Sequence, residues 1–529
     1  MSDGYWRRCA VVWMAGAMSL AGVAQAQTGT TQTGTTQTQT QPGAQTGTQT
    51  GGRAVHGANG ITLPAPPSTE KHPVTDTLHG DTITDNYRWL EDQKAPATRA
   101  WLEQQDEYTQ QYLAQVKMRA EITADLTNLM RVESYSVPQL RGDRYFFKKR
   151  LPEENQGSLY MRSGMASADE KLVDAAKLSA DQNTSIDIED ISNDGALLVY
   201  GIRQGGADEV AIHVLDVAKR QELPDQLVSQ RYMGVQISPD KKGLYYSLFT
   251  HAGTLVYWHA FGTLQSADKV IFGKEYQGEK LGELDLVGIS ISDNGHWLIL
   301  TIDHGVPAKR ADILLKDLRQ PDAPVVALVY GIDNRFSLLD AGRDEFLVQT
   351  DWKAQNGRIL LADMKAKPDA WKTIVPEGKN VIESASVVGG KLFVDRLADV
   401  KSETTIYTLD GTQVGRLSYP GIGTGSVVHG KPLAKEGFYT FQSFNVPPTI
   451  YRYETESAKS EVFAAPKVPF DSAKYEVRQV FYTSKDGTRV PMFIAGKKGM
   501  ALTGKTQVLM TAYGGFNVSM TAGWNPMYA

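Results

Sequence analysis

The sequence contains little that could cross-link the chain or bind a metal. Its only cysteine is Cys9, near the N-terminus, so the rest of the chain can form no disulfide and must be held by packing alone. The nine histidines form no H-E-x-x-H or H-x-H cluster, which argues against a zinc peptidase. We therefore expect no metal site and no cofactor.

A strong charge of either sign is also missing. The chain has 55 Lys and Arg against 60 Asp and Glu, a net charge of −5 at pH 7. Proteins that bind nucleic acid usually show a basic patch or a high pI, so we expect no nucleic-acid partner. With 41% hydrophobic and 22% charged residues, the composition is that of a folded globular protein. A length of 529 residues predicts more than one domain.

The N-terminal apolar run, Cys9 to Val23, is short for a bilayer span, which needs about 20 residues. Arg7 and Arg8 precede it, and Ala24-Gln25-Ala26 follows it as a small-residue cleavage site. Residues 1–26 are therefore predicted to be a secretory signal peptide cut after Ala26. This predicts a periplasmic or secreted protein with no stable membrane association after cleavage. A membrane anchor is the alternative, and both the general and the twin-arginine export routes stay open.

Two further segments precede the bulk of the chain. Residues 28–52 are almost entirely Thr, Gln and Gly and cannot bury apolar surface, so 27–63 is predicted to be a disordered tether. Residues 64–135 are predicted to be an N-terminal helical segment. Between Ala97 and Met130 there is no Gly or Pro, and apolar side chains such as Trp101 recur at helical spacing. A helical hairpin and two consecutive helices both fit this pattern.

From residue 136 to 475, short strand-like runs alternate with turns. Three similar turns each follow an isoleucine: Ser192-Asn193-Asp194-Gly195, Ser238-Pro239-Asp240 and Ser292-Asp293-Asn294-Gly295. Repeats of about 45 to 55 residues, made of short strands and Asp, Asn or Gly turns, are typical of β-propellers. Dividing the segment by this repeat predicts seven blades. Six or eight blades, or one irregular β-sandwich, are alternatives.

The pattern changes again at residue 476. Val477–Thr483 and Val490–Ala495 are predicted strands joined by a turn, and Gln507–Thr511 is predicted to be a third, apolar strand. A strand followed by a glycine pair suits the early part of an α/β-hydrolase sheet. Residues 476–529 are therefore predicted to begin an α/β-hydrolase domain. The expected fold is a seven-bladed β-propeller plus a partial α/β-hydrolase domain, to which the N-terminal helical segment also belongs.

Three further stretches are distinctive: Tyr87-Arg88-Trp89-Leu90-Glu91-Asp92, the segment from Phe481 to Ile494, and Tyr513-Gly514-Gly515-Phe516. Together they resemble the prolyl oligopeptidase family of serine peptidases. The order of the parts, a helical segment, a propeller and then a hydrolase, also resembles the family. This resemblance implies a monomeric serine endopeptidase whose propeller covers the active site. Its partners would be short proline-containing peptides, cleaved on the C-terminal side of proline, while folded proteins are spared.

The resemblance also implies roles for four residues. The hydroxyl of Tyr513 would donate a hydrogen bond to the oxyanion that forms during peptide cleavage. A buried aromatic residue at a strand end is the alternative interpretation of Tyr513. Gly514 and Gly515 would let the backbone turn tightly beside the substrate, and Phe516 would line the substrate pocket or simply pack in the core.

The departure from the family lies in the catalytic triad. The serine nucleophile of the family lies on a G-x-S-x-G elbow, and no such pattern occurs in these 529 residues. No residue of the chain can be assigned to the Ser, Asp and His of the triad, so we expect the chain alone to be inactive. Two alternatives remain: a non-catalytic propeller that binds peptides or acts as a scaffold, and a related hydrolase that cleaves after basic residues.

Overall fold

The computed structural model describes residues 54–57, 60–250, 253–320, 322–342, 345–501, 503–515 and 518–528. They form two compact units, one ending at Leu129 and the other beginning at Met130, and each is described by itself. The predicted signal peptide and most of the predicted tether lie outside the described residues. In the part of the chain that the structure describes, no helix is both long and apolar enough to cross a membrane.

The first unit begins with two short strands, β1 (Val55–His56) and β2 (Thr62–Leu63), which pair antiparallel. They fall inside the stretch predicted to be a disordered tether, and for these residues the prediction is wrong. The reason is local: Ile61 and Leu63 are buried, with 8% and 6% of their surfaces exposed. Two apolar side chains are enough to order the end of an otherwise polar segment when a helix is present to cover them.

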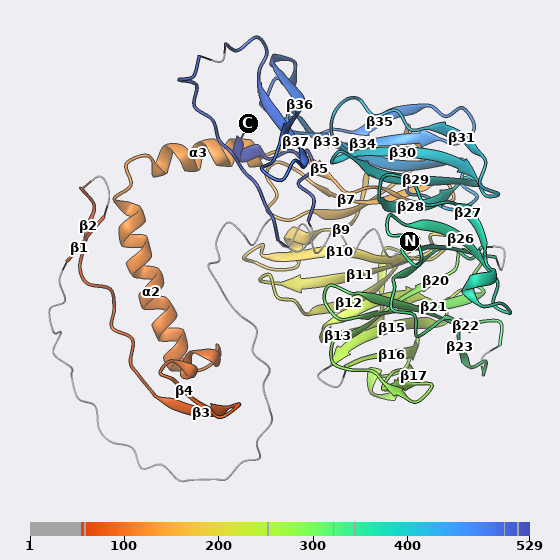
Figure 1. Ribbon diagram of the computed structural model, residues 1–529. Helices are drawn as coiled ribbons and strands as arrows, with labels where there is room; N and C mark the ends of the chain where they lie inside the picture. The colour runs from red at the N-terminus through yellow and green to blue at the C-terminus, as the bar shows by residue number, and fades with distance from the viewer. Residues whose placement is uncertain are drawn as a thin grey trace, which may run out of the picture. The chain divides into compact units, whose positions relative to one another are not determined.

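The helical part of this unit contains α2 (Pro96–Ala114) and α3 (Arg119–Met130), preceded by the hairpin of β3 (Val74–Leu78) and β4 (Asp81–Asp85) and the short η2 (Arg88–Glu91) (Figure 1). Pro96 occupies the first turn of α2, where its fixed φ and missing N–H are tolerated. In η2, Arg88 pairs with Asp76 of β3, and the Trp89 indole N–H donates to the Glu70 carbonyl at 3.1 Å.

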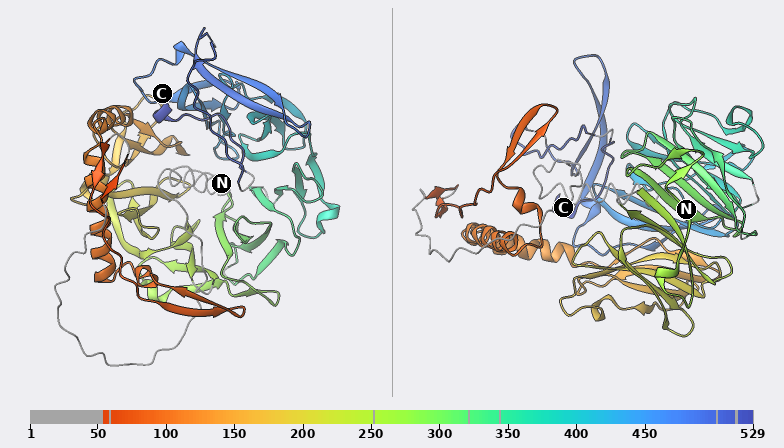
Figure 2. Two further views of the ribbon diagram at one scale, coloured as in Figure 1. Left: turned by 60° about the vertical axis from the view of Figure 1, so that its left-hand side comes forward. Right: turned by 90° about the horizontal axis from the view of Figure 1, so that it is seen from below.

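The second unit is a ring of seven antiparallel sheets around a central axis (Figure 2). The prediction of a seven-bladed β-propeller is therefore confirmed. Each blade is a four-stranded meander, and the first blade has one additional strand. The strands are, in blade 1, β5 (Ser134–Tyr135), β6 (Gln139–Arg141), β7 (Arg144–Arg150), β8 (Ser158–Ser163) and β9 (Glu170–Val173); in blade 2, β10 (Thr184–Ile191), β11 (Leu197–Gln204), β12 (Val210–Asp216) and β13 (Gln221–Gln230); in blade 3, β14 (Tyr232–Ile237), β15 (Gly243–Thr250), β16 (Gly253–Ala260) and β17 (Lys269–Phe272).

The remaining blades follow the same order. They contain, in blade 4, β20 (Asp285–Ile291), β21 (Trp297–His304), β22 (Arg310–Asp317) and β23 (Val325–Val329); in blade 5, β24 (Phe336–Asp340), β25 (Phe346–Thr350), β26 (Arg358–Ala362) and β27 (Lys372–Val375); in blade 6, β28 (Ile382–Val388), β29 (Lys391–Ala398), β30 (Lys401–Thr408) and β31 (Gln413–Arg416); in blade 7, β32 (Thr424–Gly425), β33 (Glu436–Ser443), β34 (Val446–Glu454) and β35 (Ser460–Ala464). A small hairpin of β18 (Glu275–Tyr276) and β19 (Glu279–Lys280) lies between blades 3 and 4 in the sequence.

The repeated turns of the sequence join the first and second strands of blades 2, 3 and 4, and a serine holds each of them. In blade 4, Ser292 is buried; its Oγ donates to Asn294 Oδ1 at 2.7 Å and accepts from the Trp297 N–H at 2.9 Å. Ser192 and Ser238 make the same kind of contacts in blades 2 and 3. Such side-chain contacts fix a turn locally, which is why the motif could be recognised without the rest of the fold.

The core of the ring is divided among the interfaces between blades. Seven clusters of buried apolar side chains occur among the described residues, and each contains side chains of two neighbouring blades. The ring closes between blades 1 and 7 without a shared strand. Instead, Phe147 and Tyr145 pack against Phe438, and the Tyr145 hydroxyl donates to Glu436 Oε1 at 2.5 Å across the interface. Burial of apolar surface and one polar contact therefore hold the ring closed.

After the propeller, β36 (Tyr475–Thr483) and β37 (Arg489–Lys497) form an antiparallel hairpin. The predicted third strand, Gln507–Thr511, is wrong: these residues are not in a strand, and the side chains of Val508, Leu509 and Met510 are 79%, 73% and 84% exposed. A strand needs a neighbour for its backbone hydrogen bonds, and among the described residues the sheet of β36 and β37 has only these two strands. The apolar side chains of this segment are therefore not sufficient to form a strand.

Candidate functional site

The two ends of the propeller axis can be told apart by the segments of the chain that lie at each of them. The chain enters blade 1 at Ser134 and leaves blade 7 at Ala464, and the hairpin of β36 and β37 follows; we call this the hairpin end. The turns between the first and second strands lie at the opposite end, the turn end. Contacts between turns of different blades, such as Arg144 with the Asp194 carbonyl and Asn294 with the Gly342 carbonyl, show that these turns lie together.

The residues after the hairpin are fastened to blade 7 at the hairpin end. The Thr424 hydroxyl donates to the Ala522 carbonyl at 2.7 Å, and the Trp524 N–H donates to Gln442 Oε1 at 3.2 Å. The Trp524 ring packs on Phe470 with ring centroids 5.1 Å apart. Ala522 is fully buried. The Tyr-Gly-Gly-Phe segment therefore lies in a stretch whose two sides are anchored, by the hairpin and by these contacts.

Tyr513 and Gly515 lie close together. Tyr513 is half-buried and Gly514 is exposed. A Cβ placed on Gly515 would lie 2.9 Å from the Tyr513 Oη and 3.1 Å from its Cζ, so the hydroxyl end of the phenol lies close to Gly515. A side chain at position 515 would require the phenol to shift. Phe516, the fourth predicted site residue, lies outside the described residues.

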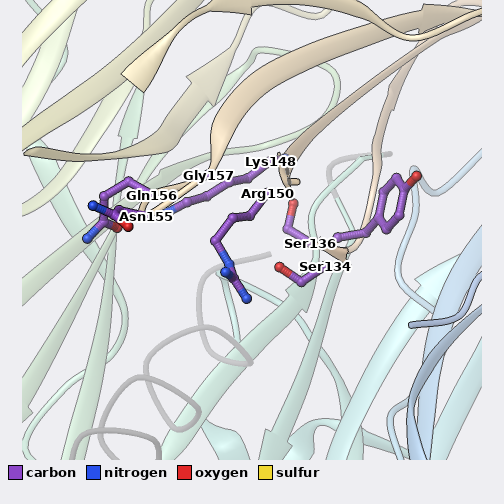
Figure 3. Close-up of a pocket in the computed structure, with 8 residues that line it drawn as sticks. Ser134, Ser136, Lys148, Arg150, Asn155, Gln156 and Gly157 are labelled. Atoms are coloured by element: carbon purple, nitrogen blue, oxygen red, sulfur yellow. Dashed lines mark hydrogen bonds between the residues drawn. The ribbon is translucent and has the colours of Figure 1, made fainter. Parts of the chain in front are cut away.

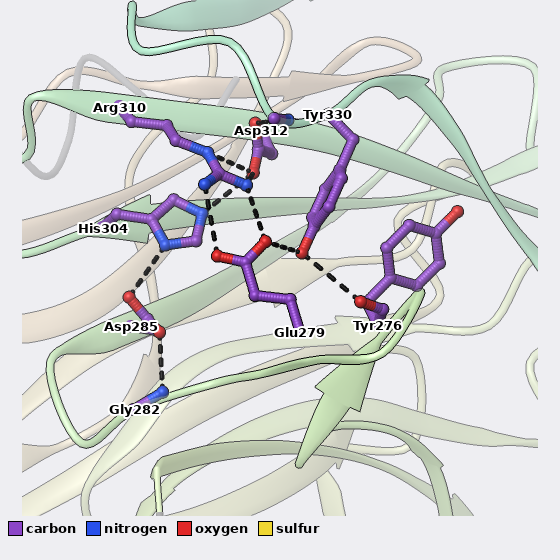
Figure 4. Close-up of polar contacts among 9 residues, drawn as sticks. Tyr276, Glu279, Gly282, Asp285, His304, Arg310, Asp312 and Tyr330 are labelled. Atoms are coloured by element: carbon purple, nitrogen blue, oxygen red, sulfur yellow. Dashed lines mark hydrogen bonds and ion pairs between the residues drawn. The ribbon is translucent and has the colours of Figure 1, made fainter.

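A network of charged side chains lies at the hairpin end of blade 4 (Figure 4). The two ring nitrogens of His304 bind Asp285 at 2.8 Å and Asp312 at 2.9 Å. Arg310 binds the same Asp312 at 2.6 Å and reaches Glu279 of β19 at 3.3 Å. We call these five residues, together with Tyr330, the blade 4 network.

Each charge in the blade 4 network is matched by a partner. Burial disfavours the charge of Arg310, but hydrogen bonds to Asp312 and Glu279 outweigh it and raise the pKa of Arg310. Hydrogen bonds from Tyr330 and Arg310 lower the pKa of Glu279, and burial together with Glu279 raises the pKa of Tyr330 to about 12. Arg310 and Tyr330 both bind Glu279, so the network ties blade 4 to the β18–β19 hairpin. Asp312 is fully buried and bound on both oxygens, and both ring nitrogens of His304 contact aspartates.

A pocket of about 380 Å³ opens at the hairpin end of blade 1 (Figure 3). It is lined by Ser134, Tyr135, Ser136, Lys148, Arg150, Asn155, Gln156 and Gly157. Both cations are already bound: Lys148 pairs with Asp187 at 2.8 Å, and Arg150 donates to the carbonyls of Met130, Val132 and Glu154. The pocket can therefore offer hydroxyl and amide groups to a polar neutral ligand, but no unpaired cation for an anion.

Sequence reasoning missed the pairing of histidines with acids in the propeller. His259 is buried, with Asp268 at 2.7 Å and Asp225 at 3.5 Å, and His304 has the two aspartates described above. From the sequence, each of these histidines is interpreted as an isolated structural residue, because the acidic partners lie 8 to 34 positions away in the chain. In the part of the chain that is described, no group of three or more His, Cys, Asp or Glu side chains could hold a metal ion.

Comparison with known proteins places this architecture in a family. Residues 66–466 match the family model described as the prolyl oligopeptidase N-terminal β-propeller domain. The chain belongs to the prolyl oligopeptidase family. The match covers the ring and most of the helical segment before it, which confirms the resemblance inferred from the three sequence motifs.

Three relatives show how similar this chain is to known proteins in sequence and in fold. A prolyl endopeptidase of Elizabethkingia miricola is 32% identical over 466 residues, which are 86% of this chain and 64% of the relative. A solved prolyl endopeptidase structure is 32% identical with a TM-score of 0.78, covering 87% of this chain and 68% of that one. Prolyl oligopeptidase B of Galerina marginata, bound to a 35-residue substrate, shares the fold with 21% identity and a TM-score of 0.75, covering 88% of this chain and 69% of that one. The chain thus spans about two thirds of the length of the relatives that it matches.

Proposed function

We propose that this chain provides the propeller and the first strands of the α/β-hydrolase domain of an exported prolyl endopeptidase. The observation that carries the proposal is the match of 401 consecutive residues, 66–466, to the family's propeller, together with a relative of that activity at 32% identity. The reaction would be cleavage of short peptides on the C-terminal side of proline by a serine nucleophile. The predicted signal peptide adds a periplasmic or secreted location, and the protein would act as a monomer.

In this proposal Tyr513 is the oxyanion donor. Attack of a serine on the peptide carbonyl places negative charge on the carbonyl oxygen, and a fixed O–H donor stabilises that charge. The nearness of the Tyr513 hydroxyl to Gly515 supports a donor placed beside the backbone of the glycine pair. Gly514 and Gly515 would keep the backbone close to the substrate, and Phe516 would contact it.

The triad is the part of this mechanism that the 529 residues do not supply, since they contain no G-x-S-x-G elbow. We therefore expect that the 529-residue chain, purified alone, does not hydrolyse a blocked Gly-Pro reporter peptide above background. A comparison of initial rates with those of buffer and of the Tyr513→Phe variant checks this. Turnover by the chain that the Tyr513→Phe substitution abolishes would contradict the expectation.

The gene itself offers the decisive companion experiment. A reading frame that continues past codon 529 and encodes a serine elbow, then an aspartate and a histidine, would support the endopeptidase. For the product of such a frame, Tyr513→Phe should lower kcat by about a hundredfold to a thousandfold, the usual effect of losing one oxyanion donor. A stop codon at that point would favour a non-catalytic peptide-binding or scaffold module instead.

A further inference from the structure

At the turn end of the propeller, three side chains from distant parts of the sequence meet. Asn193 lies in the turn of blade 2, Asp293 in the turn of blade 4, and Lys431 in the loop between β32 and β33 of blade 7. The Lys431 ammonium lies 2.6 Å from Asp293 Oδ1 and donates to Asn193 Oδ1 at 2.8 Å. The Asn193 amide in turn donates to the backbone carbonyl of Asp293 at 3.1 Å. Every pair within the trio is therefore in direct contact.

These contacts differ in kind from the contacts between neighbouring blades that the described residues make at this end. Arg141 of blade 1 donates to the Ile191 carbonyl of blade 2, and the Ile237 N–H of blade 3 donates to Asp190 of blade 2. Such contacts run around the rim of the ring. Blades 2, 4 and 7 are not neighbours in a seven-membered ring: blade 3 separates the first two, and at least one blade separates each of them from blade 7. Side chains of these blades can meet only across the axis.

Partial burial and opposite charges stabilise the contact of Lys431 with Asp293. The side chains of Lys431 and Asp293 are only 20% and 26% exposed. Burial and the nearby Arg141 guanidinium lower the pKa of Lys431, and the carboxylates of Asp293 and Asp190 work in the opposite direction. A charged lysine in this position depends on its acidic partner, since removing one member of a buried ion pair leaves the other charge uncompensated.

We propose that Asn193, Asp293 and Lys431 form a latch that closes the turn end of the propeller axis. Molecules the size of a peptide then cannot reach the interior of the ring along the axis from this end. Closure is a property of the chain itself. Its consequence for the enzyme, that peptide substrates reach the active site only from the hairpin end, rests on the proposed function.

The absence of cysteine after Cys9 allows a direct test on the chain, with Cys9→Ser as the background. A reporter thiol is introduced by Ser290→Cys. Ser290 is half-buried on β20, the inner strand of blade 4, three positions before Asp293. Neighbouring blades cover both faces of each sheet, so the exposed part of an inner-strand side chain faces the axis. Ser185→Cys, on a half-buried residue at the hairpin end of the inner strand β10, is the matched control.

The measurement is the rate at which each thiol reacts with a maleimide that carries a long polyethylene glycol chain. With the latch intact, the thiol of Ser290→Cys should react more slowly than that of Ser185→Cys. Adding Lys431→Asp, which places two like charges together, should raise the rate at position 290 by about tenfold or more, the factor expected when a charge-assisted hydrogen bond is lost from an open–closed equilibrium. The rate at position 185 should not change.

Two further variants separate closure from general damage to the fold. The charge swap Lys431→Asp with Asp293→Lys should restore slow labelling, and Asp293→Asn, which keeps the shape of the side chain, should raise the labelling rate without unfolding the ring. Equal labelling of the two thiols with the latch intact would overturn the proposal. An unchanged rate at position 290 in both Lys431→Asp and Asp293→Asn would also overturn it. Neither readout uses peptidase activity, so the result is independent of whether the proposed function holds.

Discussion

At the scale of single residues, the structure separates side chains that tie the fold together from those that could act on a substrate. Tyr513 is the one predicted site residue whose side chain is described, and its hydroxyl end lies close to Gly515. The charged residues elsewhere are mostly paired within the ring. The carboxyl group of Glu189 on β10 is different, because it lies in surroundings that disfavour its charge.

Glu189 gives a prediction for the pH dependence of stability. Burial, with the charge of Asp187 adding to it and Arg203 opposing it, raises the pKa of Glu189 to about 7 from an ordinary value of 4.5. Because the folded-state pKa is raised, the protonated group contributes stability that is fully present below about pH 4.5 and is lost as the pH rises to about 7. Above that, the folded state holds an unfavourable carboxylate, at a cost on the order of 3 kcal/mol.

The substitution Glu189→Gln removes the titration. We expect it to raise the free energy of unfolding by about 1–3 kcal/mol near pH 8 and to have little effect near pH 4.5. Urea unfolding of both proteins at the two pH values measures this, and Glu283→Gln, at an exposed position in the loop after β19, controls for the loss of one negative charge. A gain of the same size at both pH values would show that burial of the charge is not the cause.

At the scale of elements, the sequence predicted those structures whose determinants are local. The turns with Ser192, Ser238 and Ser292 are closed by contacts within about five positions, so their repeat revealed the propeller and its number of blades. The predicted strand Gln507–Thr511 is wrong because a strand depends on partners that a local pattern does not specify. The blade 4 network and the latch were not predicted for the same reason: Lys431 and Asn193 are 238 positions apart.

The turn serines should therefore contribute more to the stability of the fold than is usual for a serine in a loop. Ser292→Ala removes the acceptor for the Trp297 N–H and leaves that buried donor without this bond, which should cost about 1–2 kcal/mol of stability. Ser290→Ala, two positions earlier on the same chain segment and half-buried, is the matched control and should cost less. Thermal unfolding of the two variants compares them. Equal losses would mean that the turn hydroxyl adds nothing beyond the removal of a serine.

At the scale of the whole molecule, the ring has one interface that differs from the other six. Blades 1 and 7 are the ends of the propeller in the sequence, so no loop between consecutive blades crosses this interface, and the two blades share no strand. Apolar packing and the contact of Tyr145 with Glu436 close the interface, and Arg452 binds the same Glu436. Together with the latch, which reaches blade 7 from across the axis, this contact opposes separation of the two terminal blades.

A substitution at this interface should loosen the ring at one place. Tyr145→Phe keeps the packing but removes the hydroxyl that Glu436 accepts from, at a cost of about 1–3 kcal/mol for a hydrogen bond to a charged group. Tyr200→Phe is a matched control, since the Tyr200 hydroxyl is bonded to Glu222 within blade 2. Hydrogen exchange should rise on β7 of blade 1 and on β33 of blade 7 together in Tyr145→Phe, because both strands are exposed when the interface opens.

In Tyr200→Phe, faster exchange should stay within blade 2 and the strands that pack on it. The comparison holds the chemistry constant and changes only whether the bond joins two blades at the ends of the ring or two strands of one blade. If Tyr145→Phe raised exchange on β7 alone and left β33 unchanged, the contact would be a local one and the packing of Phe147 and Phe438 would be sufficient to close the ring.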